Sequence, residues 1–128
     1  METVPSIMAF HLRYRLWIAE LNFDIDILRI FDDYLYKLAN KENEPEVRSG
    51  VAYFKKQFTI ARKEIDQLRH NMHLLKMELA AYSREGKNLA PDDLEGNDHS
   101  TLKKHHARFR RNFNKLKMTF SDFESKWL

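Results

Sequence analysis

The sequence predicts an all-α fold, an up-down-up bundle of three long helices at about residues 6–41, 44–85 and 98–127, with coiled-coil-like heptad seams. Three observations favour this fold. Only three Gly and three Pro occur in 128 residues, and long uninterrupted segments separate them. Apolar residues recur at alternating steps of four and three. The first connection is short, which requires antiparallel neighbours.

Each segment carries one such row of apolar residues, with a polar member in the first and the third. A mean period of 3.5 sustained over many turns predicts helices that pack nearly parallel with a left-handed supercoil. The first row is Phe10, Tyr14, Trp17, Leu21, Asp24, Leu28, Phe31, Leu35 and Leu38. The second is Val47, Val51, Phe54, Phe58, Ala61, Ile65, Leu68, Met72, Leu75, Leu79 and Tyr82. The third is Leu102, His106, Phe109, Phe113, Leu116, Phe120, Phe123 and Trp127.

The ends of the helices have their own sequence signals. Pro5 and Ser6 suit an N-terminal turn before the first helix. Asn43 is expected to cap the second helix with its side chain, and Pro45 is tolerated in the first turn. Gly86 ends the second helix in the position that glycine usually takes.

The chain is expected to form a single helical-bundle domain, residues 1–128, with an acidic linker at 86–98. A length of 128 residues with 43% hydrophobic content suffices for one core. The linker holds Pro91 and Gly96, which separate the second helix from the third.

Charged residues along the predicted hairpin suggest its register. If the chain turns near residues 43 and 44, two residues lie opposite each other when their numbers add up to about 87 or 88. The second helix has a basic row, and the acids of the first helix are expected to face it: Asp32 or Asp33 at Lys55, Asp24 or Asp26 at Arg62, and Glu20 at Arg69. Such exposed pairs contribute about 0–1 kcal/mol each, so they set register more than stability.

The first helix is apolar over a wider arc than the other two. Besides its seam it has Ile18 and Ile25 on one flank, and a longer row on the other flank. A patch that two neighbours cannot cover usually marks an association surface, so we expect a homodimer or a helical protein partner there. A splayed bundle or the acidic linker could instead cover this flank within one chain. The residues of the expected interface are Leu16, Phe23, Ile27, Ile30 and Tyr34.

Asp24 and His106 are polar residues in apolar seams, so each is either a site or a device that sets register. Counting along the hairpins places them at different levels of the bundle, so they are not expected to be partners. A carboxylate in a seam costs several kcal/mol unless it is paired or hydrated. We therefore expect that Arg62 reaches Asp24, or that Asp24 is hydrated at a position where the third helix diverges.

The level of His106 also holds His11, His73 and His70, from all three helices. Imidazoles from adjacent helices can bind zinc. The alternative is surface histidines together with one half-buried His106. His70 and His73 lie outside the seam of the second helix, so no metal site is assigned.

The third helix carries seven cations and no acid between Thr101 and Met118. A basic helix can bind phosphate backbones or anionic lipid headgroups, which makes nucleic acid or an anionic membrane the alternative partner. The linker acids could instead fold back and neutralise these charges, which we expect to encircle the helix. The candidate anion-binding residues are Lys103, Lys104, Arg108, Arg110, Arg111, Lys115 and Lys117.

Chemistry is not indicated elsewhere in the sequence. The absence of cysteine excludes thiolate catalysis and disulfides, and no catalytic triad or carboxylate pair with plausible convergence occurs. Neither a cofactor nor a small-molecule substrate is expected. No secretory signal is evident, so a cytoplasmic location is expected. The predicted function is a non-enzymatic interaction or scaffolding bundle that associates with itself through its first helix.

Overall fold

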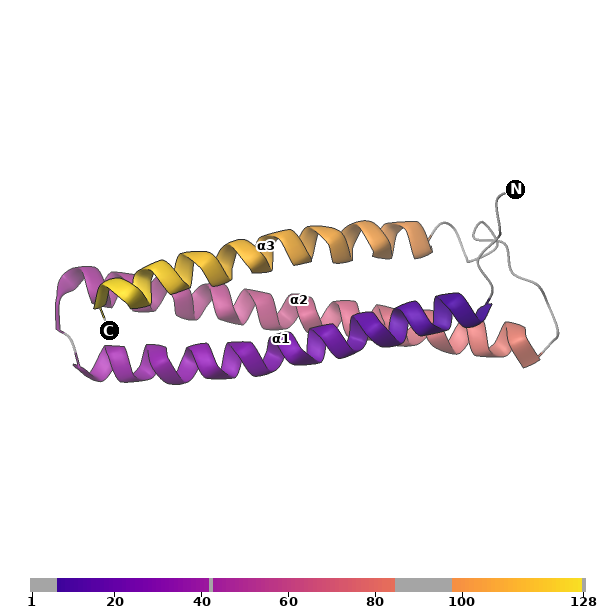
Figure 1. Ribbon diagram of the computed structural model, residues 1–128, viewed down its shortest axis with the longest axis horizontal. Coiled ribbons are helices and arrows are strands. Elements are labelled where there is room, and N and C mark those ends of the chain that lie inside the picture. Colours follow the sequence, from indigo (N-terminus) through magenta and orange to yellow (C-terminus); the bar gives the residue numbers. More distant parts are fainter. Residues whose placement is uncertain (1–6, 42, 85–97, 128) are drawn as a thin grey trace.

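The computed structural model describes residues 7–41, 43–84 and 98–127, and these form the predicted bundle of three helices. The helices are α1 (Ile7–Lys41), α2 (Pro45–Arg84) and α3 (Asp98–Trp127). α2 runs antiparallel to both others, so the order is up-down-up (Figure 1). The fold class and the three helices are therefore confirmed. The expected ends at Pro5, Ser6 and Gly86, and most of the linker at 86–98, lie outside the described residues.

Every member of the three predicted seams is buried or half-buried, which explains how the sequence specifies the bundle. The largest fully buried side chains come from all three helices, among them Tyr14, Phe58 and Phe109. Burying a large apolar side chain contributes about 1.5–3 kcal/mol. The helices are therefore held together chiefly by their seams, because helix propensity alone stabilises such long elements only weakly.

The start of α2 differs from the expectation in its capping residue. The backbone nitrogen of Arg48 donates to the carbonyl of Glu44 at 3.1 Å, which is the first hydrogen bond of the helix. Glu44 therefore occupies the N-cap position, and Pro45 follows at the first helical position, where its missing N–H is not needed. Asn43 lies one residue before the cap.

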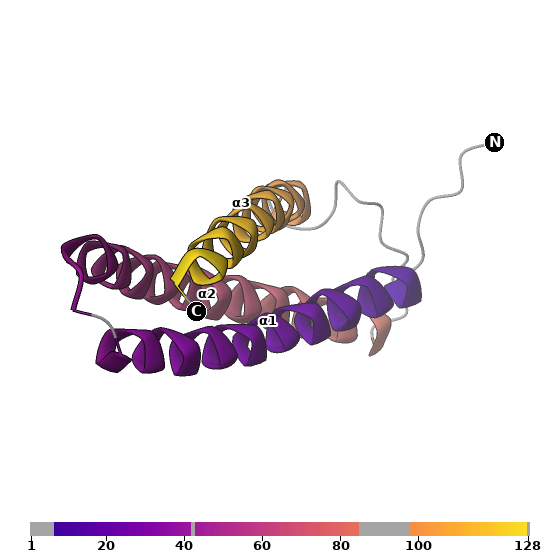
Figure 2. The same ribbon diagram turned by 60° about the vertical axis from the view of Figure 1, so that its left-hand side comes forward.

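α2 lies between the other two helices and packs along both, whereas α1 and α3 approach each other closely at few backbone positions. Figures 1 and 2 show α3 lying along α2 with its axis apart from that of α1. Long and aromatic side chains span the distance between α1 and α3. Phe31 and Phe120 are 4.6 Å apart between ring centroids, and Trp17 and His106 are 4.5 Å apart.

Gly50 lies against the Phe123 ring of α3. A Cβ atom built on this residue would lie 2.6 Å from Cζ of Phe123, closer than real Cβ atoms come to other atoms. The missing side chain of Gly50 therefore lets the Phe123 ring lie against the backbone of α2. This close packing accounts for a glycine inside a helix, where it otherwise costs about 1 kcal/mol relative to alanine.

The register of the α1–α2 hairpin differs from the one expected from the charges. Arg62 pairs with Asp32, and Arg69 donates to Oδ1 of Asn22 at 2.8 Å. Arg62 thus reaches a residue six to eight positions further toward the C-terminus of α1 than expected, and Arg69 reaches one that is two positions further. The expected pairs Asp24 or Asp26 with Arg62, and Glu20 with Arg69, were wrong. The cause is that helical side chains lean toward the N-terminus of their own helix, so antiparallel partners meet across an offset.

Candidate functional site

The predicted interface residues of α1 lie on one outward face of the helix. Leu16 is 60% exposed, Phe23 63%, Ile30 54% and Tyr34 45%, whereas Ile27 is half-buried and packs against the core. We call these five residues the α1 row. The four exposed side chains follow one another on this face at spacings of seven, seven and four residues, and such a row is typical of an association surface.

The opposite apolar flank of α1 is absorbed by the bundle. Ile18 is buried as part of the core, and Ile25 is half-buried against it. The wide apolar arc that the sequence predicts on α1 therefore divides into two parts. One part completes the core toward α2, and the other, the α1 row, is left uncovered by α2 and α3.

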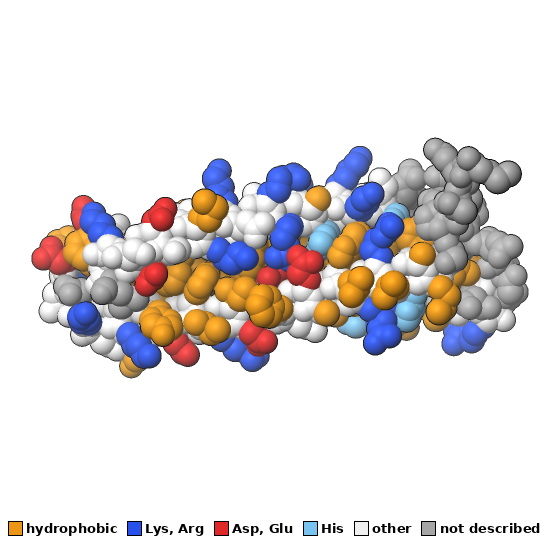
Figure 3. Space-filling model, in the orientation of Figure 1, with side chains coloured by type: hydrophobic (Ala, Val, Ile, Leu, Met, Phe, Trp, Pro, Cys, Tyr) orange, Lys and Arg blue, Asp and Glu red, His pale blue; other side chains and the backbone are white. Residues whose placement is uncertain are grey.

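A hollow with a volume of about 400 Å³ adjoins the α1 row between α1 and α3. Figure 3 shows hydrophobic side chains gathered along α1 and in the space between the two helices. The hollow exists because α1 and α3 are held apart by bridging side chains. Its lining residues are Ile30, Phe31, Tyr34, Phe120, Ser121 and Glu124.

Asp24, the polar member of the α1 seam, is paired with Arg110 of α3. Nη1 of Arg110 donates to Oδ1 of Asp24 at 3.1 Å and Nη2 donates to Oδ2 at 2.6 Å. The Nε atom of the same guanidinium lies 2.5 Å from Oε1 of Glu20. The expectation that Arg62 would reach Asp24 was wrong, because Arg62 pairs with Asp32 instead.

This arrangement fixes α3 against α1. The side chain of Asp24 is only 2% exposed, and that of Arg110 is 21% exposed. A two-pronged guanidinium–carboxylate pair is directional as well as charged. It therefore helps to set the height and rotation of α3 against α1, two helices whose backbones come close at few positions.

His106 lies over Trp17 as a stacked ring, with the ring centroids 4.5 Å apart. Burial lowers the pKa of His106. The nearby Glu20 carboxylate raises this pKa and the Arg110 guanidinium lowers it, so their two effects oppose each other. Within the described ranges, its buried Nε2 has no hydrogen-bond partner. The neutral imidazole of His106 therefore packs flat against the Trp17 ring, as an apolar side chain would.

His99 is a second buried histidine, which the sequence interpretation missed. The Tyr14 hydroxyl is hydrogen-bonded to Nδ1 of His99, and the Phe10 ring meets the imidazole edge-on at 4.5 Å between centroids. Burial, followed by the charges of Arg13 and Lys103, lowers the pKa of His99, and burial raises that of Tyr14 to about 12. A signal was available, since the alternating steps of the third seam continue one step back to residue 99.

These two histidines predict a loss of stability in mild acid. An unfolded imidazole titrates at about 6.5, and in the fold the pKa of each ring is lower. The unfolded chain therefore binds more protons below about pH 6.5, so stability present above that pH falls as the pH decreases toward the folded pKa. Urea unfolding at pH 7.5 and pH 5 should show a lower free energy of unfolding at pH 5. His106→Phe should preserve the ring contact with Trp17 and reduce this pH dependence. An unchanged dependence in that variant would argue against a buried, neutral His106.

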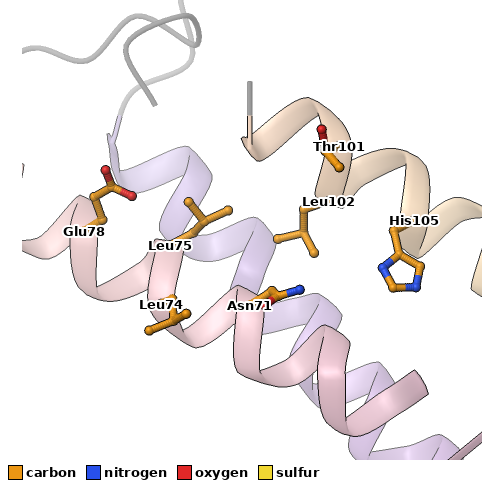
Figure 4. Close-up of a pocket in the computed structure, with 7 residues that line it drawn as sticks. All are labelled: Asn71, Leu74, Leu75, Glu78, Thr101, Leu102 and His105. Carbon is orange, nitrogen blue, oxygen red and sulfur yellow. The ribbon is translucent and has the colours of Figure 1, made fainter. Parts of the chain in front are cut away.

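A second hollow, of about 330 Å³, lies between α2 and α3 near the start of α3 (Figure 4). Leu75 and Leu102 point toward each other across it, and Glu78 and His105 lie at opposite ends of the view. His105 faces Oε1 of Glu64 at 3.1 Å, so it already has a carboxylate partner. The lining shows no convergence of an acid, a base and a nucleophile. The remaining lining residues are Asn71, Leu74 and Thr101.

The histidines expected at one level do not assemble into a ligand set. In residues 7–41, 43–84 and 98–127, no three of the His, Cys, Asp and Glu side chains are placed to hold a metal ion. His106 instead contacts Trp17, and His73 and His70 are exposed on α2. None of the three helices, in the part of the chain described, has a stretch long and apolar enough to cross a bilayer.

The seven cations of α3 do not encircle the helix as expected. Arg110 turns inward to Asp24 and Glu20. The Lys117 ammonium lies over the ring of Phe113, 5.4 Å from its centroid. Lys103 is exposed on the same flank as Arg110. The other four share the outward face opposite the seam: Lys104, Arg108, Arg111 and Lys115.

Comparison with known proteins gave no relationship from which to argue. No family model matches the chain, and neither the curated proteins nor the solved structures contain a significant match.

Proposed function

We propose that this chain is an interaction module that forms a homodimer through the α1 row. The observation that carries the proposal is the exposure of Leu16, Phe23, Ile30 and Tyr34 on one face of a rigid helix. Exposed apolar side chains cost solubility unless they are covered, and aromatic residues are enriched in the centres of protein interfaces.

The adjoining hollow supports association at this face. Ile30 and Tyr34 belong both to the α1 row and to the lining of the hollow. A helix that docks on the row can therefore insert side chains between α1 and α3. Shape complementarity of this kind distinguishes a specific interface from simple apolar contact.

Charge placement favours a second copy of the chain in antiparallel orientation. A two-fold axis near residues 24 and 25 brings Phe23 beside Ile27 of the other copy and Leu16 beside Tyr34. The same axis brings exposed Arg15 beside exposed Asp33, twice in the dimer. A two-fold interface must be self-complementary, and this face of α1 meets that requirement.

Sedimentation velocity at tens of micromolar tests the proposal. The wild-type chain should sediment as a dimer, and Phe23→Glu/Ile30→Glu should sediment as a monomer with unchanged helix content, because both side chains are exposed. The matched control is Ile60→Glu/Leu74→Glu, which places the same charges at exposed apolar positions of α2 and should remain dimeric. A monomeric wild-type chain contradicts the homodimer and leaves a different helical protein as the partner to seek.

A charge exchange tests the orientation separately. Arg15→Glu should weaken the dimer, because the new carboxylate faces Asp33 of the other copy. Adding Asp33→Arg should restore it by reversing both charges. Failure of the second change to rescue the first would reject the antiparallel register while leaving dimer formation through the row untouched.

A further inference from the structure

The outward face of α3 carries four cations in a line, Lys104, Arg108, Arg111 and Lys115, which we call the basic stripe. Their spacing of four, three and four residues places them one above another on the face opposite the buried seam. All four are exposed. The line extends over about 16 Å of helix, at 1.5 Å per residue. Figure 3 shows Lys and Arg side chains projecting from the outer edge of the molecule, where α3 lies.

The cations of the stripe have no acidic partner among the described residues, unlike several other cations of the bundle. Arg62 pairs with Asp32, and Lys126 with Glu46. Arg110 is paired with the carboxylates of Asp24 and Glu20 on α1. Like charges three and four residues apart on a helix repel each other and cost a few tenths of a kcal/mol per pair. The stripe therefore keeps its positive charge at the surface, and a bound polyanion would offset the repulsion.

The neighbouring side chains favour a polyanion that lies along the helix. Exposed Ala107, Asn112 and Asn114 border the stripe, so the surface is free of acids and holds amide donors for phosphate oxygens. No large apolar side chain stands on the outward face between Lys104 and Lys115. Amphipathic helices bind membranes by burying an apolar face in the lipid, and the apolar face of α3 is already occupied by the bundle core.

We infer that the basic stripe is a binding site for the phosphodiester backbone of a nucleic acid duplex. Four cations in a rigid line can neutralise up to four phosphates and release their counterions. Contacts with phosphate oxygens do not distinguish one base from another, so we expect binding to be independent of the nucleotide sequence. The site lies on α3, so it does not depend on the α1 row or on dimer formation.

Fluorescence anisotropy with a labelled duplex DNA of about 20 base pairs, measured across a series of NaCl concentrations, tests this site. A plot of log K against log salt should have a slope of about −3 to −4, as about 0.9 per neutralised phosphate requires. Affinity should then fall roughly a hundredfold between 50 and 200 mM salt. Duplexes of unrelated sequence should bind equally. Each single Gln substitution in the stripe should reduce the slope by about 1.

The quadruple variant Lys104→Gln/Arg108→Gln/Arg111→Gln/Lys115→Gln should lose binding. It removes four positive charges and changes the formal net charge from +3 to −1. The matched control Arg48→Gln/Lys55→Gln/Lys56→Gln/Lys63→Gln removes the same charge from exposed positions of α2 and should retain binding. Equal loss in both variants would overturn the site in favour of a general charge effect. Binding to phosphatidylserine vesicles without binding to the duplex would overturn the choice of nucleic acid, as would failure to bind either probe.

Discussion

Replacing Arg110 with Met is expected to lower the free energy of unfolding by about 3–5 kcal/mol, one of the two largest effects that the structure predicts for a single substitution. The change leaves the Asp24 carboxylate, whose side chain is 2% exposed, without its two-pronged donor. A buried charge that loses its partner costs about this much, because the carboxylate remains out of water with nothing to compensate it. Urea unfolding followed by circular dichroism at pH 7.5 measures the difference.

A comparison with an exposed pair separates burial from charge. Arg62→Met removes the cation that pairs with Asp32, where both side chains are more than a third exposed, and we expect a cost of no more than about 1 kcal/mol. The double substitution Asp24→Leu/Arg110→Met should recover most of the stability, because replacing both members of a buried pair by apolar groups is often neutral. Equal losses for Arg62→Met and Arg110→Met would count against this account of Asp24.

The partner of Asp24 shows where sequence reasoning reached its limit. The seam identifies Asp24 as a polar residue among apolar ones, and its burial follows from that position. Arg62 was chosen because it lies directly opposite Asp24 when residues are counted from the turn of the hairpin. The choice failed because side chains in antiparallel helices lean in opposite directions. Arg110 belongs to the third helix, whose height against the first depends on the long connection that precedes it. No periodicity within the helices encodes that height.

The fold itself was much easier to predict, for a physical reason. An alternation of four and three residues sustained through 30 to 40 residues is compatible with few structures other than packed helices. The bounds of α1, α2 and α3 agree with the expected ones to within one residue. The exposed flank of α1 also followed from the positions of its apolar residues, because their arc around the helix is wider than two neighbours can cover, and Leu16, Phe23, Ile30 and Tyr34 are exposed. The sequence did not predict that Arg110 would be paired while the basic stripe would be left without acidic partners among the described residues, because this depends on which acids of α1 face α3.

Replacing Phe120 is expected to destabilise the bundle about as much as replacing Arg110, because its ring contacts both other helices near the C-terminal end of α3. Its ring lies 4.6 Å from Phe31 of α1, 5.2 Å from Phe54 and 5.3 Å from Phe58 of α2, between centroids. The side chain is 3% exposed. Phe120→Ala should lower the free energy of unfolding by about 3–5 kcal/mol, the usual cost of removing a buried aromatic ring and leaving a cavity.

The measurement is urea unfolding together with amide hydrogen exchange of α3. Phe120→Leu preserves most of the volume and should cost less than about 1.5 kcal/mol. Tyr53→Ala, at a position 53% exposed on α2, serves as the surface control and should lie within about 0.5 kcal/mol of the wild type. Because α1 and α3 have few close backbone contacts, the loss of Phe120 should also speed exchange in the C-terminal half of α3 more than in α2. Uniform exchange in α2 and α3 would mean that α3 is held along its whole length by α2, and that Phe31 and Phe120 do not serve as a local link to α1.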